Sequence, residues 1–384
     1  MLITADTLLT GRELLRPAWF EIEAGTVRGL GSGTAPRRAD RNLGAVTVVP
    51  GFVDTHVHGG GGTNFSSGSC SGASQAAAVV AAGLHLRHGT TTIVASLVAA
   101  GPDDLTRQVR ELADDVGRGV IAGIHLEGPW LAAERCGAQQ PSVLRDPDRD
   151  ELDRLLATGA GTIKMITLAP ERRGAVPAIR RIVDAGVVAA VGHTDATYEQ
   201  TRAAIAAGAT VGTHLFNAMR PINHREPGPV IALLEDSRVT VEMITDGVHV
   251  DAALYRHVCR SVGDVRVSLV TDAMAAAGMA DGAYRLGPVA VDVVGGVARV
   301  AGTQTIAAST ATMDRQFRFA VNHSGLARDE ALMAAVRQAS INPARALGLP
   351  CTGLVAGATA DMVVMDAELA VTGVLHRGSW VIEP

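Results

Sequence analysis

Short apolar runs rich in β-branched residues recur along the middle of the chain, and longer alanine-rich stretches separate most of them. We predict a strand in each run and a helix in each longer stretch, such as Ser74–His88, Asp103–Val116, Ala196–Ala207 and Ala252–Val262. The predicted strands are Thr47–Asp54, Thr90–Ser96, Val120–Glu127, Thr162–Leu168, Val187–His193, Ala209–His214, Val239–Thr245 and Val265–Asp272. Alternation of strand and helix through eight strands predicts an α/β fold, a parallel (β/α)8 TIM-type barrel.

The two ends of the chain do not follow this rhythm. Short strand-like pieces, such as Trp19–Ile22 and Asp361–Met365, are separated there by turn residues. Because exposed strand edges need partners, we predict that residues 1–49 and 350–384 pair in one small β-sandwich domain. The barrel then occupies residues 50–349.

Two further segments follow the eighth strand. Tyr284–Val300 alternates around a Gly-Gly pair and predicts a β-hairpin inserted into the barrel. Thr310–His323 and Asp329–Leu347 predict the helices that close it.

Length and charge narrow the class of protein. A chain of 384 residues suits a barrel with a small appendage, and a net charge of −5 without a basic stripe argues against nucleic acid as a partner. No apolar run approaches the roughly 20 residues that span a bilayer, and the N-terminus lacks a secretory pattern, so we expect a cytoplasmic protein with no membrane contact. The four cysteines form no CxxC pair and are expected to be reduced thiols; Cys136 could line a pocket.

Polar residues stand where the predicted strands end. His56 and His58 alternate in an extended segment, so both imidazoles point to the same face and can bind one cation. A single histidine at a strand end is more often structural. The C-terminal ends of barrel strands meet on one face, however, and the other polar residues there are Glu127, His193, His214 and Asp272. Six such residues on one barrel face predict a metal-activated hydrolytic site.

Lys164 is the only lysine of the chain. Many two-metal barrel hydrolases bridge their ions with a carboxylated lysine at the end of the fourth strand. Lys164 lies inside the run Thr162–Leu168 rather than at its end, so we interpret it as structural and Glu127 as the bridging or anchoring anion.

Seven segments together resemble the N-acetylglucosamine-6-phosphate deacetylase family of the amidohydrolase superfamily. The combination of His-Leu-Glu-Gly-Pro, His-Leu-Phe-Asn-Ala-Met and Arg-Glu-Pro-Gly is highly specific, and the resemblance covers almost the whole chain. The segments are Pro50–Gly59, His125–Trp130, Val191–Ala196, Thr213–Met219, Arg225–Gly228, Asp246–Asp251 and Val270–Met274.

The resemblance implies the roles of the metal-site residues. Glu127, His193 and His214 correspond to the ligands of the main catalytic divalent metal, for which zinc or iron is expected. His56 and His58 either hold a second ion that shares Glu127 or hydrogen-bond without metal, so one or two ions are expected. Asp272 corresponds to the catalytic acid/base.

The implied substrate is N-acetylglucosamine 6-phosphate, hydrolysed to glucosamine 6-phosphate and acetate. The family match assigns the phosphate to the backbone of Asn217 and Ala218, to Arg225 and to His249. In relatives the arginine loop can reach the neighbouring subunit's site, which implies a homodimer. The remaining expected substrate contacts are Ala138, Gln139, Ile306, Ala307 and Ala308.

Two positions depart from the family pattern. Gln139 stands where the family commonly has a histidine that contacts the sugar, and Ala308 takes the place of a usual glycine. An amide can donate a hydrogen bond but cannot carry a proton. Two alternatives therefore stay open: a deacetylase of another N-acetylated sugar phosphate or amide, such as N-acetylgalactosamine 6-phosphate, and a barrel that serves as a non-catalytic scaffold.

Overall fold

The computed structural model describes residues 1–66, 73–350 and 353–384, without the side chains of residues 73–75. Cys70 and Cys351, two of the predicted reduced thiols, lie outside the described residues. Cys136 and Cys259 are free cysteines, as expected.

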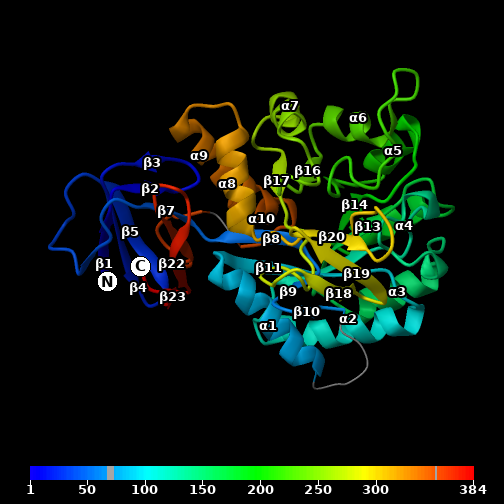
Figure 1. Ribbon diagram of the computed structural model, residues 1–384, viewed down its shortest axis with the longest axis horizontal. Coiled ribbons are helices and arrows are strands. Elements are labelled where there is room, and N and C mark those ends of the chain that lie inside the picture. The colour runs from blue at the N-terminus through cyan, green and yellow to red at the C-terminus, as the bar shows by residue number, and fades with distance from the viewer. Residues whose placement is uncertain (67–72, 351–352) are drawn as a thin grey trace.

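The central element is an eight-stranded sheet in which each strand is parallel to its sequence neighbour. Helices surround this sheet, and the chain order of the strands is also their spatial order (Figure 1). The strands are β8 (Phe52–Val57), β11 (Thr90–Leu97), β12 (Gly123–Glu127), β13 (Ile163–Leu168), β14 (Val188–Val191), β15 (Val211–Gly212), β16 (Thr240–Met243) and β17 (Val267–Leu269). The predicted parallel barrel is confirmed.

Side chains join the first and last strands of this sheet. The Asp54 carboxylate accepts a hydrogen bond from the Thr271 amide at 3.2 Å and another from the Thr271 hydroxyl. The Asp272 amide donates to the His56 carbonyl at 2.8 Å. These contacts nearly close the barrel and place Asp272 beside β8, which carries His56 and leads directly to His58.

The first predicted strand is really two strands. β7 (Thr47–Pro50) belongs to the small domain, β8 belongs to the barrel, and Gly51 separates them. A Cβ on Gly51 would lie 2.1 Å from the Thr91 hydroxyl oxygen, so only glycine allows this close approach. The prediction of one continuous strand over Thr47–Asp54 was wrong for that reason.

Local sequence explains where several helices begin. Pro102 opens α2, the Asp148 carboxylate caps α3, and Thr197 with Gln200 forms a capping box at α5. None of the helices in the described part of the chain is long and apolar enough to cross a membrane. The helices are α1 (Ala73–Arg87), α2 (Pro102–Gly117), α3 (Arg149–Thr158), α4 (Ala175–Asp184), α5 (Tyr198–Ala206), α6 (Gly228–Glu235), α7 (Ala252–Val262), α8 (Met313–His323), α9 (Arg328–Val336) and α10 (Asn342–Ala346).

Both predictions for the segment after the eighth strand need correction. Tyr284–Val300 is a three-stranded antiparallel sheet of β18 (Gly282–Leu286), β19 (Val289–Val294) and β20 (Val297–Val300), because a second turn at Gly287 adds a strand to the expected hairpin. The last predicted helix is divided by a π-helical segment, Arg337–Ile341, which separates α9 from α10. Pro343 cannot donate a main-chain hydrogen bond and stands in the first turn of α10.

Two sheets built from both ends of the chain form the small domain, on the left in Figure 1. Their facing sides bury one apolar cluster that includes Phe20, Val48, Met362 and Leu375. The four-stranded sheet has the order β5 (Thr26–Ser32), β4 (Ala18–Glu23), β1 (Leu2–Ala5) and β6 (Arg41–Asn42). The six-stranded sheet has the order β23 (Ser379–Ile382), β22 (Val371–His376), β21 (Met362–Met365), β7, β2 (Thr7–Leu9) and β3 (Leu14–Leu15). The predicted sandwich of both termini is confirmed, while domain boundaries at residues 49 and 350 stay a prediction.

Candidate metal centre and active site

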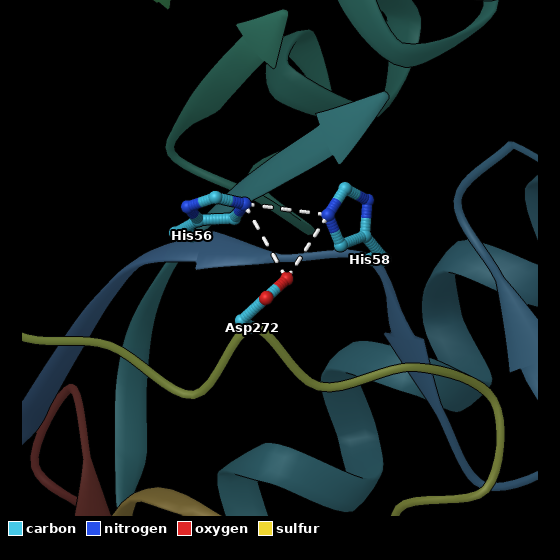
Figure 2. Close-up of side chains that lie close together, drawn as sticks. All are labelled: His56, His58 and Asp272. Carbon is cyan, nitrogen blue, oxygen red and sulfur yellow. Dashed lines mark hydrogen bonds and ion pairs between the residues drawn. The ribbon is translucent and has the colours of Figure 1, made fainter. Parts of the chain in front are cut away.

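His56 lies near the end of β8 and His58 directly follows the strand, so the two alternate in extended backbone and both imidazoles are buried. Their Nε2 atoms lie 3.3 Å apart. The Asp272 Oδ1 atom lies 3.4 Å from Nε2 of His56 and 3.2 Å from Nε2 of His58. Figure 2 shows the three groups pointing toward one common centre. Among the residues that the structure describes, this is the first of two groups of side chains that could hold a metal ion.

Glu127, His193 and His214 form the second group. Glu127 ends β12, and its Oε1 atom lies 3.0 Å from Nε2 of each of these two histidines. His193 and His214 lie beyond β14 and β15, with φ angles of 46° and 29°, and Asp272 beyond β17 has a φ of 49°. Non-glycine residues rarely adopt this left-handed conformation, and such strain gathers at functional sites.

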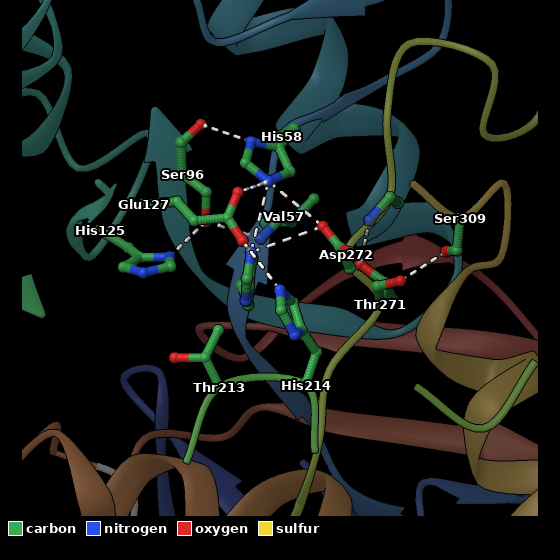
Figure 3. A network of polar contacts seen from close by, with 12 residues as sticks. Val57, His58, Ser96, His125, Glu127, Thr213, His214, Thr271, Asp272 and Ser309 are labelled. Atoms are coloured by element: carbon green, nitrogen blue, oxygen red, sulfur yellow. Dashed lines mark hydrogen bonds and ion pairs between the residues drawn. The ribbon is translucent and has the colours of Figure 1, made fainter. Parts of the chain in front are cut away.

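Glu127 connects the two groups. Its Oε1 atom also lies 3.3 Å from Nε2 of His56, and its Oε2 atom lies 3.2 Å from Nε2 of His58. Figure 3 shows the Glu127 carboxylate beside the imidazoles of His58 and His214, with Asp272 opposite it. A carboxylate in this position can serve ions in both groups, as expected for a bridging anion.

The outer nitrogens of three histidines are fixed by oxygen acceptors. His193 Nδ1 donates to the Arg135 carbonyl at 2.9 Å, and His58 Nδ1 donates to the Ser96 carbonyl at 3.2 Å. His56 Nδ1 contacts the Glu242 carboxylate at 3.2 Å. A proton on each Nδ1 leaves the lone pair of Nε2 facing the centre, which is the tautomer that binds metal. The residues present therefore fit a divalent cation, and their mixed nitrogen and oxygen donors suit zinc or iron.

Burial and opposite charge act against each other on the carboxylates. Burial favours the neutral acid, but His193 and His56 in their protonated forms outweigh it and hold the pKa of Glu127 well below its ordinary range. Burial likewise opposes ionisation of Asp272, yet His56 and His58 lower its pKa. Both groups are ionised near neutral pH, as a ligand and a proton acceptor must be.

Several residues of the centre had no role in the sequence prediction. Glu242 is a buried carboxylate inside β16 that contacts His56. Its signal was present, because a lone charge in an apolar strand is seldom buried without a partner. His125 is buried next to His56 and is hydrogen-bonded to the hydroxyl oxygens of Ser96 at 2.9 Å and Thr167 at 2.8 Å. Burial holds the pKa of His125 well below its ordinary value, so it is a neutral support.

A cavity of about 380 Å³ opens onto both groups. It brings together most of the predicted substrate contacts, namely Ala138, Gln139, Asn217, Ala218, His249, Ile306 and Ala307. Arg225 and Ala308 are absent from the described residues that line it. Arg225 is exposed on the surface, and Ala308 is buried in an apolar cluster with Met274 and Leu286.

Gln139 faces the metal centre as well as the cavity. Its Nε2 atom donates to Glu127 Oε2 at 2.6 Å, and its Oε1 atom accepts from the Ala99 amide at 2.8 Å. The amide therefore holds the carboxylate that joins the two metal groups. One N–H of Gln139 remains to contact a substrate.

His249 and the Asn217–Ala218 turn also line the cavity. The Ala218 carbonyl accepts a hydrogen bond from the Thr194 amide at 3.0 Å, which ties this turn to the loop after β14. His249 Nδ1 contacts the Asp246 carboxylate at 2.8 Å. Burial alone would lower the pKa of His249, but the bond to Asp246 and its charge raise it above the ordinary value.

Lys164 lies far from this chemistry. Its Nζ atom donates to the Gly161 carbonyl at 2.9 Å, at the N-terminal end of β13, whereas the site lies at the C-terminal ends of the strands. This position agrees with a structural role.

The Amidohydrolase family profile matches residues 47–381. This span covers the barrel and most of the C-terminal part of the small domain. The chain therefore belongs to the amidohydrolase family.

Within that family, the most informative likeness is to N-acetyl-D-glucosamine-6-phosphate deacetylase from Mycobacterium smegmatis. An aspartate-to-alanine mutant of that protein, solved in complex with N-acetyl-D-glucosamine-6-phosphate, is 65% identical with a TM-score of 0.97, over 100% of this chain and 99% of that chain. The human N-acetylglucosamine-6-phosphate deacetylase is 36% identical over 89% of this chain and 85% of its own length. An N-acetylgalactosamine-6-phosphate deacetylase from Escherichia coli O157:H7 is 36% identical over 87% of each chain. The family resemblance inferred from the motifs is confirmed.

Proposed function

We propose that this protein hydrolyses the acetamide of N-acetylglucosamine 6-phosphate to glucosamine 6-phosphate and acetate. The observation that carries the proposal is the pair of ligand groups joined by Glu127 at the floor of one cavity. The likeness to the Mycobacterium smegmatis deacetylase supports the choice of sugar. The non-catalytic scaffold is disfavoured, because the ligand set and the acid/base are complete.

Glu127, His193 and His214 would hold one divalent ion, and His56, His58 and Asp272 would hold the second. When bound, such ions lower the pKa of water toward about 7 and polarise the acetyl carbonyl. Asp272 accepts a proton from the attacking water and passes it to the sugar nitrogen, because an amide nitrogen leaves only when it is protonated. We propose zinc or iron as the metal and two ions per subunit.

The same proposal assigns the phosphate to the part of the cavity lined by the Asn217–Ala218 turn and His249. The backbone of Asn217 and Ala218 and the His249 imidazole line the cavity there, and the Ala218 N–H and His249 offer donors, while the Asn217 N–H also donates to the His214 carbonyl at 3.0 Å. Arg225 is exposed on its own subunit, so we propose that it serves a neighbouring copy in a homodimer. We also propose a cytoplasmic location, which cell fractionation tests.

Acetate release from a panel of substrates tests this function. We expect N-acetylglucosamine 6-phosphate to have the highest kcat/KM and N-acetylglucosamine without phosphate to be poor. N-acetylgalactosamine 6-phosphate is the second candidate, because the relative from Escherichia coli O157:H7 bears that name. A higher kcat/KM for that sugar would replace the proposed substrate, and no acetate from any N-acetylated sugar phosphate would refute the function.

A further inference from the structure

A dianionic phosphate is bound best by several donors that include cations, and besides His249 the cavity is lined by Arg135, which is the only lysine or arginine among the described residues that line it. Arg225, the arginine expected from the family resemblance, lies outside the cavity of its own subunit. Guanidinium groups bind phosphate through parallel hydrogen bonds that also fix its orientation. Arg135 is therefore the candidate for such a contact from the same subunit.

Asp195 holds the Arg135 side chain in one orientation. Nε and Nη2 of Arg135 each lie 2.8 Å from Asp195 Oδ1, and the other carboxylate oxygen accepts from Arg220 Nη2 at 2.7 Å. A guanidinium has five N–H donors, so the two contacts with Asp195 leave three for another acceptor. A guanidinium fixed in this way loses less rotational freedom when a ligand binds.

The Arg135 loop lies beside the turn expected to receive the phosphate. A Cβ built on Gly137 would lie 4.0 Å from the Ala218 Cβ, so the loop and the turn are in contact. The loop after β14 joins them, because the Thr194 amide donates to the Ala218 carbonyl and the Arg220 amide donates to the Thr194 carbonyl at 2.9 Å. Arg135, Asn217 and Ala218 thus line the same cavity from neighbouring loops that these hydrogen bonds join.

We propose that the Arg135 guanidinium binds the phosphate of the substrate within its own subunit and thereby selects phosphorylated sugars. This inference rests on the proposed function and adds to it a residue that the sequence patterns did not indicate. Glu134 also lines the cavity, but it is exposed, so its carboxylate can turn to solvent when an anion binds. Glu226 lies 4.0 Å from Arg220, which gives that arginine a carboxylate of its own.

The main-chain carbonyl of Arg135 has a role that differs from that of its side chain. Its carbonyl accepts the hydrogen bond from His193 Nδ1 and so fixes the tautomer of a metal ligand. A side-chain substitution leaves that carbonyl in place. Metal content measured on each variant therefore distinguishes loss of the phosphate contact from collapse of the loop.

The experiment compares Arg135→Gln and Arg135→Lys with the matched control Arg220→Gln. Arg220 bonds the same Asp195 carboxylate but is not among the described residues that line the cavity. For Arg135→Gln we expect kcat/KM for N-acetylglucosamine 6-phosphate to fall by about 10- to 100-fold, the scale of a lost charge-assisted hydrogen bond. Inhibition by inorganic phosphate should weaken to the same extent. Arg135→Lys should recover part of the loss, because it restores the charge without the planar donor pair.

Metal content of Arg135→Gln, the kcat/KM of unphosphorylated N-acetylglucosamine and all properties of Arg220→Gln should stay within about threefold of the unsubstituted protein. Equal losses for both sugars, or loss of metal, would show that Arg135 supports the loop and would overturn the proposal. Unchanged inhibition by inorganic phosphate would overturn it as well. Failure of the unsubstituted protein to release acetate from any phosphorylated sugar is a different result, since it refutes the proposed function itself.

Discussion

The Asp272 carboxylate is held ionised by two imidazoles, and its backbone adopts a strained left-handed conformation beside them. We expect Asp272→Asn to keep the fold and the size of the side chain but to remove the proton acceptor. The value of kcat should fall by about 100-fold or more. Steady-state kinetics measures this, with inhibition by glucosamine 6-phosphate as the check that ligand still binds. A near-normal kcat would assign proton transfer to another group.

The two ligand groups should differ in their response to truncation. Removing Glu127, His193 or His214 by alanine substitution deletes a ligand of the main ion, so we expect loss of activity together with loss of bound metal. The double variant His56→Ala/His58→Ala should lose at most one ion and keep the other. Metal analysis of protein purified without added metal measures both results. Full metal content in all three single variants would contradict the ligand assignment.

Phosphate binding through His249 should weaken as pH rises. Its pKa is raised in the folded protein, so the cation and its attraction for phosphate persist at low pH and are lost as pH rises through that raised pKa. Asp246→Asn removes the group that raises the pKa. We therefore expect the increase of KM for the phosphorylated sugar to begin at lower pH in this variant. KM measured against pH tests this, and unphosphorylated N-acetylglucosamine should show no such displacement.

Among single residues, the sequence predicted the ligands that lie close together in the chain. It did not predict the residues that reach the centre from distant elements. His56 in β8 and His58 directly after it alternate in extended backbone, so their common face follows from local geometry alone. Glu242 and Arg135 act on His56 and His193 from other elements, and no spacing within the chain signals those contacts. The bond from Gln139 to Glu127 likewise depends on how the loop after β12 folds back.

The apolar periodicity predicted every barrel strand but not the residue at which each strand ends. The ladder of β14 ends at Val191 and that of β17 at Leu269, so His193 and Asp272 lie beyond the strands that were predicted to include them. Their positive φ angles take the backbone out of the ladder. The hydrophobic pattern does not show where the two ladders end, because the residues between each ladder and its ligand are still buried.

Strand β21 connects the small domain to the barrel and offers a test of that contact. Val363 is fully buried in the cluster that also contains Phe52 of β8, and β21 pairs with β7, the strand that leads into β8. We expect Val363→Ala to lower the free energy of unfolding by about 1.5–3 kcal/mol, from lost burial and the cavity left behind. Val381→Ala in β23 is the matched control, since Val381 is 41% exposed, and it should change stability by less than about 0.5 kcal/mol. Urea unfolding measures both, and equal effects would contradict this role of Val363.

For the whole molecule, the sandwich of both termini could be predicted because neither end alone supplies enough strands to cover its own edges. The six-stranded sheet bears this out, with strands from the C-terminal tail paired onto β7. The periodicity of the chain does not predict an oligomer, because subunit assembly depends on the surface of the folded molecule. The exposed position of Arg225 nevertheless makes a shared site testable.

Mixing two inactive variants tests whether Arg225 serves a partner's site. Arg225→Ala lacks the arginine but keeps Asp272, while Asp272→Asn lacks the proton acceptor but keeps Arg225. In a mixed dimer, the subunit with Asp272 would receive Arg225 from its partner, so one of the two sites becomes complete. Random exchange of equal amounts should then restore about a quarter of the kcat/KM of the unsubstituted protein, because half the dimers are mixed and each has one complete site. An arginine acting within its own subunit predicts no gain on mixing, and a monomer in sedimentation velocity would exclude a shared site altogether.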